Sequence, residues 1–153
     1  MTYRLLSVAL TSLAIVVSCS PAEETMNTKN SFSEYEIVNN KQIPWSDVLS
    51  QKEENYIVFI YTEKCGYCHD MMSEIIAFAE DDIMPTYFVD ALLYDIPISA
   101  DYEAGMTKYA DISIAGTPTI LEIYDATLIA NIPGIDWCLS FLNEKRKETN
   151  IIL

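Results

Sequence analysis

The sequence predicts an α/β domain in which a β-α-β unit is followed by a helix, a β-hairpin and a last helix. Two stretches carry most of this prediction. An apolar run of β-branched and aromatic residues ends at Thr62 and leads through Cys65 into a stretch with helical periodicity. A second run follows Gly116-Thr117-Pro118-Thr119 and turns back at Asp125-Ala126. The 153 residues are enough for one domain with a hydrophobic core.

The composition limits the classes of function. Half of the residues are hydrophobic and 21% are charged, which is typical of a globular protein. The chain has 23 acidic residues against 9 basic ones and a formal net charge of −14. Because nucleic-acid binding depends on basic surfaces, no nucleic-acid partner is expected. Neither a cofactor nor a resident metal is expected, and a monomer is the default.

The N-terminus predicts export and a lipid anchor. Residues 1–18 look like a signal peptide, because Arg4 precedes an apolar core that is too short to span a membrane as a helix. Val16-Val17-Ser18-Cys19 resembles a bacterial lipobox, in which the signal is cut before the cysteine and the cysteine is lipidated. Residues 19–43 then form a lipidated N-terminus and a flexible tether. The alternatives are an uncleaved anchor helix and an ordinary signal peptide.

The elements expected after the tether, in chain order, are a short helix over 44–49, a strand over 56–62, a helix over 65–80, a strand over 86–90, a helix over 101–110, strands over 119–124 and 128–132, and a helix from 136 to about 147. The first two strands are expected to be parallel, because a helix connects them. Asp101 and Asp136 are the predicted N-caps of the two later helices. A short edge strand over 34–38 is a further option.

Cys65 and Cys68 are the candidate reactive residues. They open the first long helix, where unpaired N–H groups and a partial positive charge favour a thiolate over a thiol. Cys65 is therefore expected to have a lowered pKa and to be the attacking sulfur. Cys68 follows three residues later, within reach to close a disulfide with Cys65 and to release whatever Cys65 has captured. The spacing predicts thiol–disulfide exchange.

Cys65-Gly-Tyr-Cys68 after a strand, together with Gly-Thr-Pro-Thr before a later one, resembles the thioredoxin family. The resemblance covers about residues 44–148 and implies a three-layer α/β/α sandwich with a mixed central sheet of about four strands, in a domain that we take as 44–153. It also implies that Pro118 follows a cis peptide bond beside the two cysteines. Thr117 then becomes a candidate for docking an extended substrate peptide.

The longer string Cys-Gly-Tyr-Cys-His is similar to the active sites of periplasmic disulfide isomerases and of thioredoxin-like accessory lipoproteins of Gram-positive bacteria. This resemblance implies an oxidoreductase, tethered outside the cytoplasm, that reduces, forms or isomerises disulfides in exported proteins with help from an unidentified redox partner. Gly66, Tyr67 and His69 would shape the site. Residues 20–43 are too short for the dimerisation domain of those isomerases. Phe59 stands where thioredoxin has a buried aspartate.

Three other functions compete with thiol–disulfide exchange. Cys-x-x-Cys-His is also the attachment string of c-type haem. Cys65, Cys68 and His69 would supply three ligands for Cu(I) or Zn, but a fourth would have to come from elsewhere. A non-catalytic accessory role in secretion would use the same fold. His69 is interpreted either as a cation near the thiolate or as a surface residue, and Cys138 as a buried, inert thiol.

Overall fold

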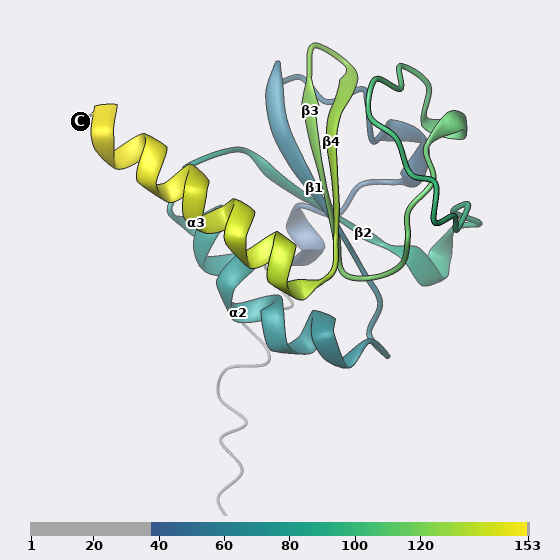
Figure 1. The fold of residues 1–153 in the computed structure, drawn as a ribbon, viewed down its shortest axis with the longest axis horizontal. Coiled ribbons are helices and arrows are strands. Elements are labelled where there is room, and N and C mark those ends of the chain that lie inside the picture. Colours follow the sequence, from purple (N-terminus) through teal and green to yellow (C-terminus); the bar gives the residue numbers. More distant parts are fainter. Residues whose placement is uncertain (1–37, 153) are drawn as a thin grey trace, which may run out of the picture.

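The computed structural model describes residues 38–152 (Figure 1). Its regular elements, in chain order, are η1 (Trp45–Asp47), β1 (Asn55–Tyr61), α2 (Gly66–Glu80), β2 (Thr86–Asp90), η2 (Ala91–Leu93), η3 (Tyr109–Asp111), β3 (Thr119–Tyr124), β4 (Thr127–Pro133) and α3 (Ile135–Ile152), where η marks a 3-10 helix. Cys19 and the predicted signal peptide lie outside the described residues, as do most residues of the predicted tether.

The four strands form one mixed sheet in the order β2-β1-β3-β4. β1 and β2 run parallel, with Tyr61 opposite Asp90, as expected of two strands joined by a helix. β3 runs antiparallel to β1, with Thr119 opposite Ile60, and β4 returns antiparallel to β3 as a hairpin. The carboxyl ends of β1 and β2 therefore lie at the same edge of the sheet as the start of β3, and this edge carries the cysteine pair.

Strand β1 is buried on both faces, which explains its uninterrupted run of apolar residues. Successive side chains alternate between the faces. Phe59 lies in the cluster that packs beneath α2 and α3, whereas Val58 and Ile60 lie in the cluster on the other face. The ring of Phe59 is fully buried and meets Phe88 of β2 edge-on, with ring centroids 6.1 Å apart.

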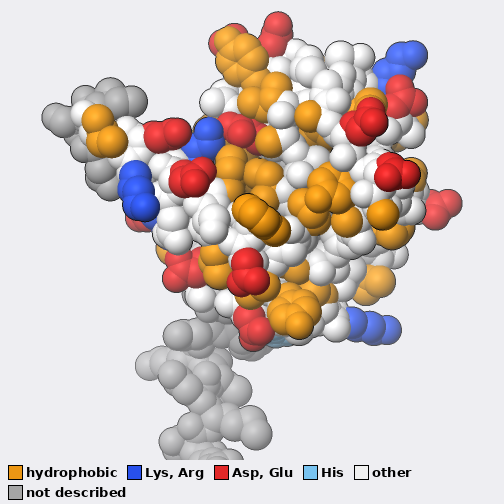
Figure 2. All heavy atoms as spheres, viewed as in Figure 1, with side chains coloured by type: hydrophobic (Ala, Val, Ile, Leu, Met, Phe, Trp, Pro, Cys, Tyr) orange, Lys and Arg blue, Asp and Glu red, His pale blue; other side chains and the backbone are white. Residues whose placement is uncertain are grey.

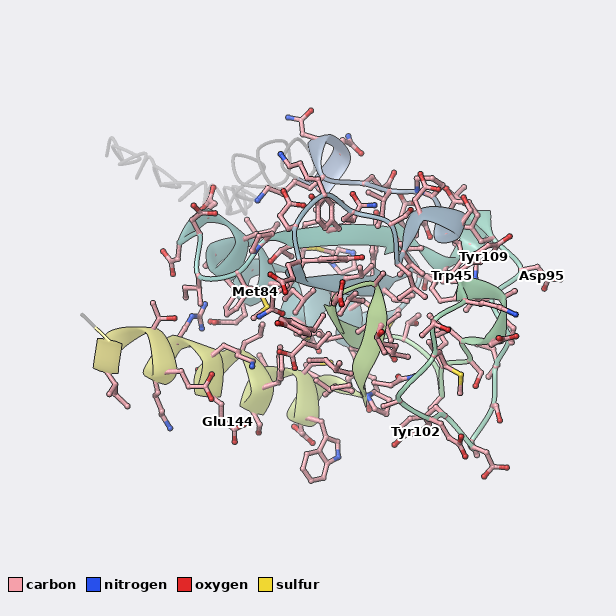
Figure 3. The ribbon with its side chains drawn as sticks, turned by 90° about the horizontal axis from the view of Figure 1, so that it is seen from above. Trp45, Met84, Asp95, Tyr102, Tyr109 and Glu144 are labelled. Atoms are coloured by element: carbon pink, nitrogen blue, oxygen red, sulfur yellow. The ribbon has the colours of Figure 1, made fainter. Side chains whose placement is uncertain are left out.

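The two long helices cover one face of the sheet, and 3-10 turns and loops cover the other (Figure 1). Ile75 and Phe78 of α2 and Leu142 of α3 are buried in the first cluster. On the opposite face, η1 lies against η3, and Figure 3 shows Trp45 and Tyr109 close together there. The predicted thioredoxin-like sandwich with a mixed four-stranded sheet is confirmed, with its third layer built from short 3-10 turns.

The predicted α-helix over 101–110 is wrong. The segment is irregular and contains only the turn η3 at its end. Its backbone bonds to the edge of β4 instead of to itself, because the Gly105 N–H donates to the Leu128 carbonyl and the Leu128 N–H donates to the Met106 carbonyl, at 2.6 and 2.9 Å. Gly105 also has a φ of +88°, which an α-helix does not allow.

The last helix is longer than predicted. Helix α3 begins at Ile135, so Asp136 lies in its first turn and does not cap it, and the helix continues to Ile152. On α2, Met71 is fully buried, whereas Met72 is only partly buried. Within residues 38–152, no helix combines the length and the apolar character needed to cross a membrane.

The packed part of the chain extends upstream of residue 44. Val38 is buried in the cluster beneath the helices. Gln42 forms an isolated parallel bridge with Phe88, and the Ile43 N–H donates to the Phe88 carbonyl at 2.9 Å. The free edge of β2 is thus covered by this short segment, which holds at least residues 38–43 on the domain.

Candidate active site

Cys65 occupies the N-cap position of α2. The chain leaves β1 at Tyr61 and makes a tight turn, in which the Cys65 N–H donates to the Thr62 carbonyl at 3.1 Å. Cys65 itself has extended dihedral angles, and its Sγ accepts a hydrogen bond from the Cys68 N–H at 3.1 Å. Because N-cap acceptors satisfy the free N–H groups of a helix, the turn directs these groups at the sulfur.

The two thiols of the site differ in exposure. Both are free cysteines in the structure. Cys65 is half-buried, and Cys68 is 1% exposed in the cluster beneath α2 and α3. Cys65 is therefore the more accessible of the two sulfurs.

The environment separates the acidities of the two thiols. Burial acts to raise the pKa of Cys65, but hydrogen bonds from the Cys68 and Thr117 side chains and from the backbone of Cys68 and Tyr67 outweigh it and lower this pKa. Burial raises the pKa of Cys68 to about 12, with a further contribution from the hydrogen bond and the charge of Cys65. Cys68 therefore holds its proton more tightly than Cys65 does.

The Thr117–Pro118 peptide bond is cis, as the resemblance implies, and it lies beside Cys65. The Cys65 thiol donates to the Thr117 carbonyl oxygen, with a sulfur–oxygen distance of 3.3 Å. The Gly134 N–H donates to the Pro118 carbonyl at 2.8 Å. The loop before β3 is therefore fixed from two sides, by the reactive cysteine and by the residue that joins β4 to α3.

Gly134 is a site residue that the sequence analysis missed. It directly follows β4, has a φ of +84° and donates the N–H that holds the Pro118 carbonyl. Its signal in the sequence was a lone glycine between a strand and a helix, which indicates a turn and says nothing of what the turn touches. Only the return of β4 beside β3 brings Gly134 to Pro118, through the pairing of Pro133 with Thr119.

The remaining predicted site residues lie on the first turn of α2. Gly66 is its first residue, with open space where a Cβ would be. The Tyr67 side chain is 65% exposed. His69 is also exposed, and its backbone N–H donates to the Cys65 carbonyl at 3.1 Å. Within residues 38–152 the His69 ring makes no hydrogen bond or ion pair, so the geometry assigns it no contact with either thiol.

Within residues 38–152, the causes of the pKa shift of Cys68 include no carboxylate. They are burial first, and then Cys65, Thr62 and Thr117. Phe59, at the place of the buried aspartate of thioredoxin, is an aromatic core residue.

Cys138 is a third thiol near the pair, and it is buried as expected. It lies in the same cluster as Cys68, and its thiol donates to the Ile132 carbonyl, with a sulfur–oxygen distance of 3.2 Å. Burial raises the pKa of Cys138 to about 12. It is therefore protonated and shielded under ordinary conditions.

The three-ligand set that a metal site would need is not assembled. Across the described part of the chain, no three His, Cys, Asp or Glu side chains gather closely enough to hold a metal ion. Cys65, Cys68 and His69, the three ligands of the metal hypothesis, are among the residues that do not gather in this way.

Comparison with known proteins gives a likeness in fold. No protein-family model and no curated protein matches this sequence. Among solved structures, thioredoxin f2 of Chlamydomonas reinhardtii is 15% identical, covers 67% of this chain and 93% of its own, and superposes with a TM-score of 0.44. The long form of thioredoxin f from spinach chloroplast is 15% identical, covers 76% and 94%, and has a TM-score of 0.45.

Proposed function

We propose that the protein is a thiol–disulfide oxidoreductase in which Cys65 is the attacking sulfur and Cys68 the resolving one. One observation carries this proposal: the half-buried Cys65 sulfur sits at the N-cap of α2 with a lowered pKa, and the buried Cys68 three residues later retains its proton. A reactive cysteine needs an accessible thiolate, and a resolving cysteine needs proximity without premature ionisation.

In the reductive direction, the Cys65 thiolate attacks one sulfur of a substrate disulfide. A Cys65–substrate disulfide forms, and the second substrate sulfur leaves as a thiolate. Cys68 then loses its proton and attacks the Cys65 sulfur, which closes the Cys65–Cys68 disulfide and releases the first substrate sulfur as a thiolate. Two electrons pass to the substrate, whose thiolates take up protons from Cys68 and water. The oxidative direction runs these steps backwards.

The mixed disulfide itself prepares Cys68 for its attack. The hydrogen bond and the negative charge of Cys65 both contribute to raising the pKa of Cys68. Once the Cys65 sulfur is bonded to the substrate, its charge is gone and these two contributions vanish. The pKa of Cys68 then falls, although burial, the largest cause of its shift, still raises it.

The docking of a polypeptide substrate is assigned to the loop before β3. Thr117 is half-buried, and its carbonyl lies within hydrogen-bonding distance of Cys65. An extended peptide that pairs with the backbone here places its own cysteine over the Cys65 sulfur. Such pairing is independent of the peptide's side chains and suits a general substrate range.

The same proposal places the enzyme outside the cytoplasm on a lipid anchor. Its support is the sequence of residues 1–19, which ends in the lipobox-like Val16-Val17-Ser18-Cys19. The substrates are then disulfides and thiols of exported proteins, in a compartment where disulfides persist. Radiolabelled fatty acid incorporated into the wild-type chain, but not into Cys19→Ala, would support the anchor; equal labelling of both would contradict it.

The exchange activity is tested with single cysteine variants of the full chain and a disulfide-bonded peptide. Cys65→Ser is expected to abolish exchange, and Cys68→Ser to accumulate a covalent protein–peptide adduct, visible by mass spectrometry. Cys138→Ser is the matched control and retains both rate and product, because the Cys138 thiol is buried and takes no part. Full exchange by Cys65→Ser would refute the assignment.

A further inference from the structure

Two adjacent leucines are exposed next to the end of β2. The side chains of Leu92 and Leu93 are 57% and 63% exposed. Their neighbours Ala91 and Tyr94 pack on the core, so the turn η2 buries its two ends and presents the leucines outward. The Asp90 carboxylate accepts a hydrogen bond from the Leu92 N–H at 3.0 Å, which fixes the turn. We call Leu92 and Leu93 the leucine patch.

The leucine patch lies at the same edge of the sheet as the reactive cysteine. Strands β1 and β2 are parallel, and their last paired residues are Tyr61 and Asp90. Cys65 follows four residues after Tyr61, and the leucine patch follows directly after Ala91. In the strand order β2-β1-β3, the turn after β2 and the loop before β3, which contacts Cys65, stand on opposite sides of the end of β1. The carboxyl ends of parallel strands are common sites of ligand binding.

The charges around this edge are mostly negative. The segments 62–70 and 90–95 carry four acidic side chains and one lysine, and the acidic ones are Glu63, Asp70, Asp90 and Asp95. Asp95 is exposed, and Figure 3 shows it projecting from the rim of the molecule. The whole chain has a net charge of −14, and on the face in Figure 2 acidic side chains surround several hydrophobic ones.

We propose that the leucine patch recognises the part of a substrate polypeptide next to its reacting cysteine and selects an apolar side chain there, followed by a lysine or arginine. The proposal rests on the proposed function, because it assigns specificity to the same exchange reaction. The leucines supply apolar area that a peptide side chain can cover. The surrounding carboxylates attract a basic residue and repel an acidic one, an effect that salt weakens.

The test uses three synthetic peptides, each with one cysteine in a mixed disulfide with glutathione. The first has leucines beside the cysteine and an arginine two residues away. The second replaces the leucines by serine, and the third replaces the arginine by glutamate. Single-turnover reduction by the reduced full chain is expected to be about tenfold faster for the first peptide than for the others. Glutathione disulfide serves as a substrate that lacks both the leucines and the arginine.

The variant Leu92→Ser/Leu93→Ser is expected to lose the preference for leucine while reducing glutathione disulfide at the wild-type rate. Asp95→Asn is expected to weaken the preference for arginine over glutamate. Ile129→Ser is the matched control. Ile129 is also an exposed apolar residue, but it lies on β4, away from the end of the sheet that carries Cys65. It should leave all ratios unchanged.

The outcomes separate this proposal from the proposed function. Equal rates for the three peptides with wild-type protein, or an unchanged leucine preference in the double variant, would overturn the role of the leucine patch and leave the exchange reaction standing. A wild-type chain that reduces neither the peptides nor glutathione disulfide would overturn both.

Discussion

The Cys68 backbone N–H donates a hydrogen bond to the Cys65 sulfur at 3.1 Å, so the first turn of α2 is capped by the atom that we assign to nucleophilic attack. This hydrogen bond has two effects. It satisfies a free N–H group at the start of the helix, and it stabilises a negative charge on the sulfur. The residue that supplies it is the proposed resolving cysteine.

The first prediction concerns the order in which the thiols react. Because the pKa of Cys65 is lowered and that of Cys68 is raised to about 12, iodoacetamide should label Cys65 first. The thiolate fraction of Cys65 rises as the pH rises through its pKa. The labelling rate should therefore reach half of its plateau at a pH below 9.0, the pKa of an ordinary cysteine thiol. Peptide mapping of the labelled protein measures this order, and faster labelling of Cys68 would contradict it.

The second prediction concerns Cys138. Its thiol is buried and its pKa is raised to about 12, so it should remain unlabelled in the native protein and react only after denaturation. Mass spectrometry before and after guanidinium treatment counts the modified thiols. Labelling of Cys138 at the native-state rate of Cys65 would show that α3 does not shield it.

The third prediction concerns the glycine that holds the loop before β3. Gly134 has a φ of +84°, so Gly134→Ala should lower the free energy of unfolding by about 1 kcal/mol or more, because a Cβ disfavours this conformation. Its N–H holds the Pro118 carbonyl, so substrate exchange should slow as well. Urea denaturation and exchange rates measure the two effects. Gly66→Ala is the control for stability, because open space surrounds Gly66 and its φ is not positive.

The fourth prediction concerns an ion pair beneath α3. Lys145 Nζ lies 2.9 Å from Glu122 Oε1, and the Glu122 side chain is 9% exposed in strand β3. Lys145→Met should cost up to about 3 kcal/mol of unfolding free energy, because it leaves a buried carboxylate without its partner. The double variant Glu122→Leu/Lys145→Met should recover part of this loss. Urea denaturation of the three proteins forms the test, and a double variant less stable than the single one would contradict it.

The sequence predicted the sheet and the position of the cysteine pair because their signals are local. Strands β2 and β3 fall at the predicted residues, since each is a short apolar run bounded by turn residues. The placement of Cys65 follows from the strand and helix that flank it. Even the loop before β3 was placed correctly, because Thr117-Pro118 stands directly ahead of a predicted strand.

The failures arose where distant contacts decide the local structure. The segment over 101–110 has caps and apolar residues that suit a helix, but its backbone groups are taken by the edge of β4 at Leu128. Sequence periodicity carries no information on such pairing. The same holds for Gly134 and for the leucine patch, whose places near Cys65 depend on how β4 and β2 return to β1.

The central claim is that Cys65 and Cys68 form a reversible two-electron couple. The most direct measurement is a titration of the full chain in glutathione buffers, in which free thiols are alkylated and counted by mass. We expect one transition in which two thiols disappear together while Cys138 remains reduced. A midpoint near about −270 mV would indicate a reductase and one near about −120 mV an oxidant. A chain without any transition, or a transition that persists in Cys65→Ser, would contradict the account.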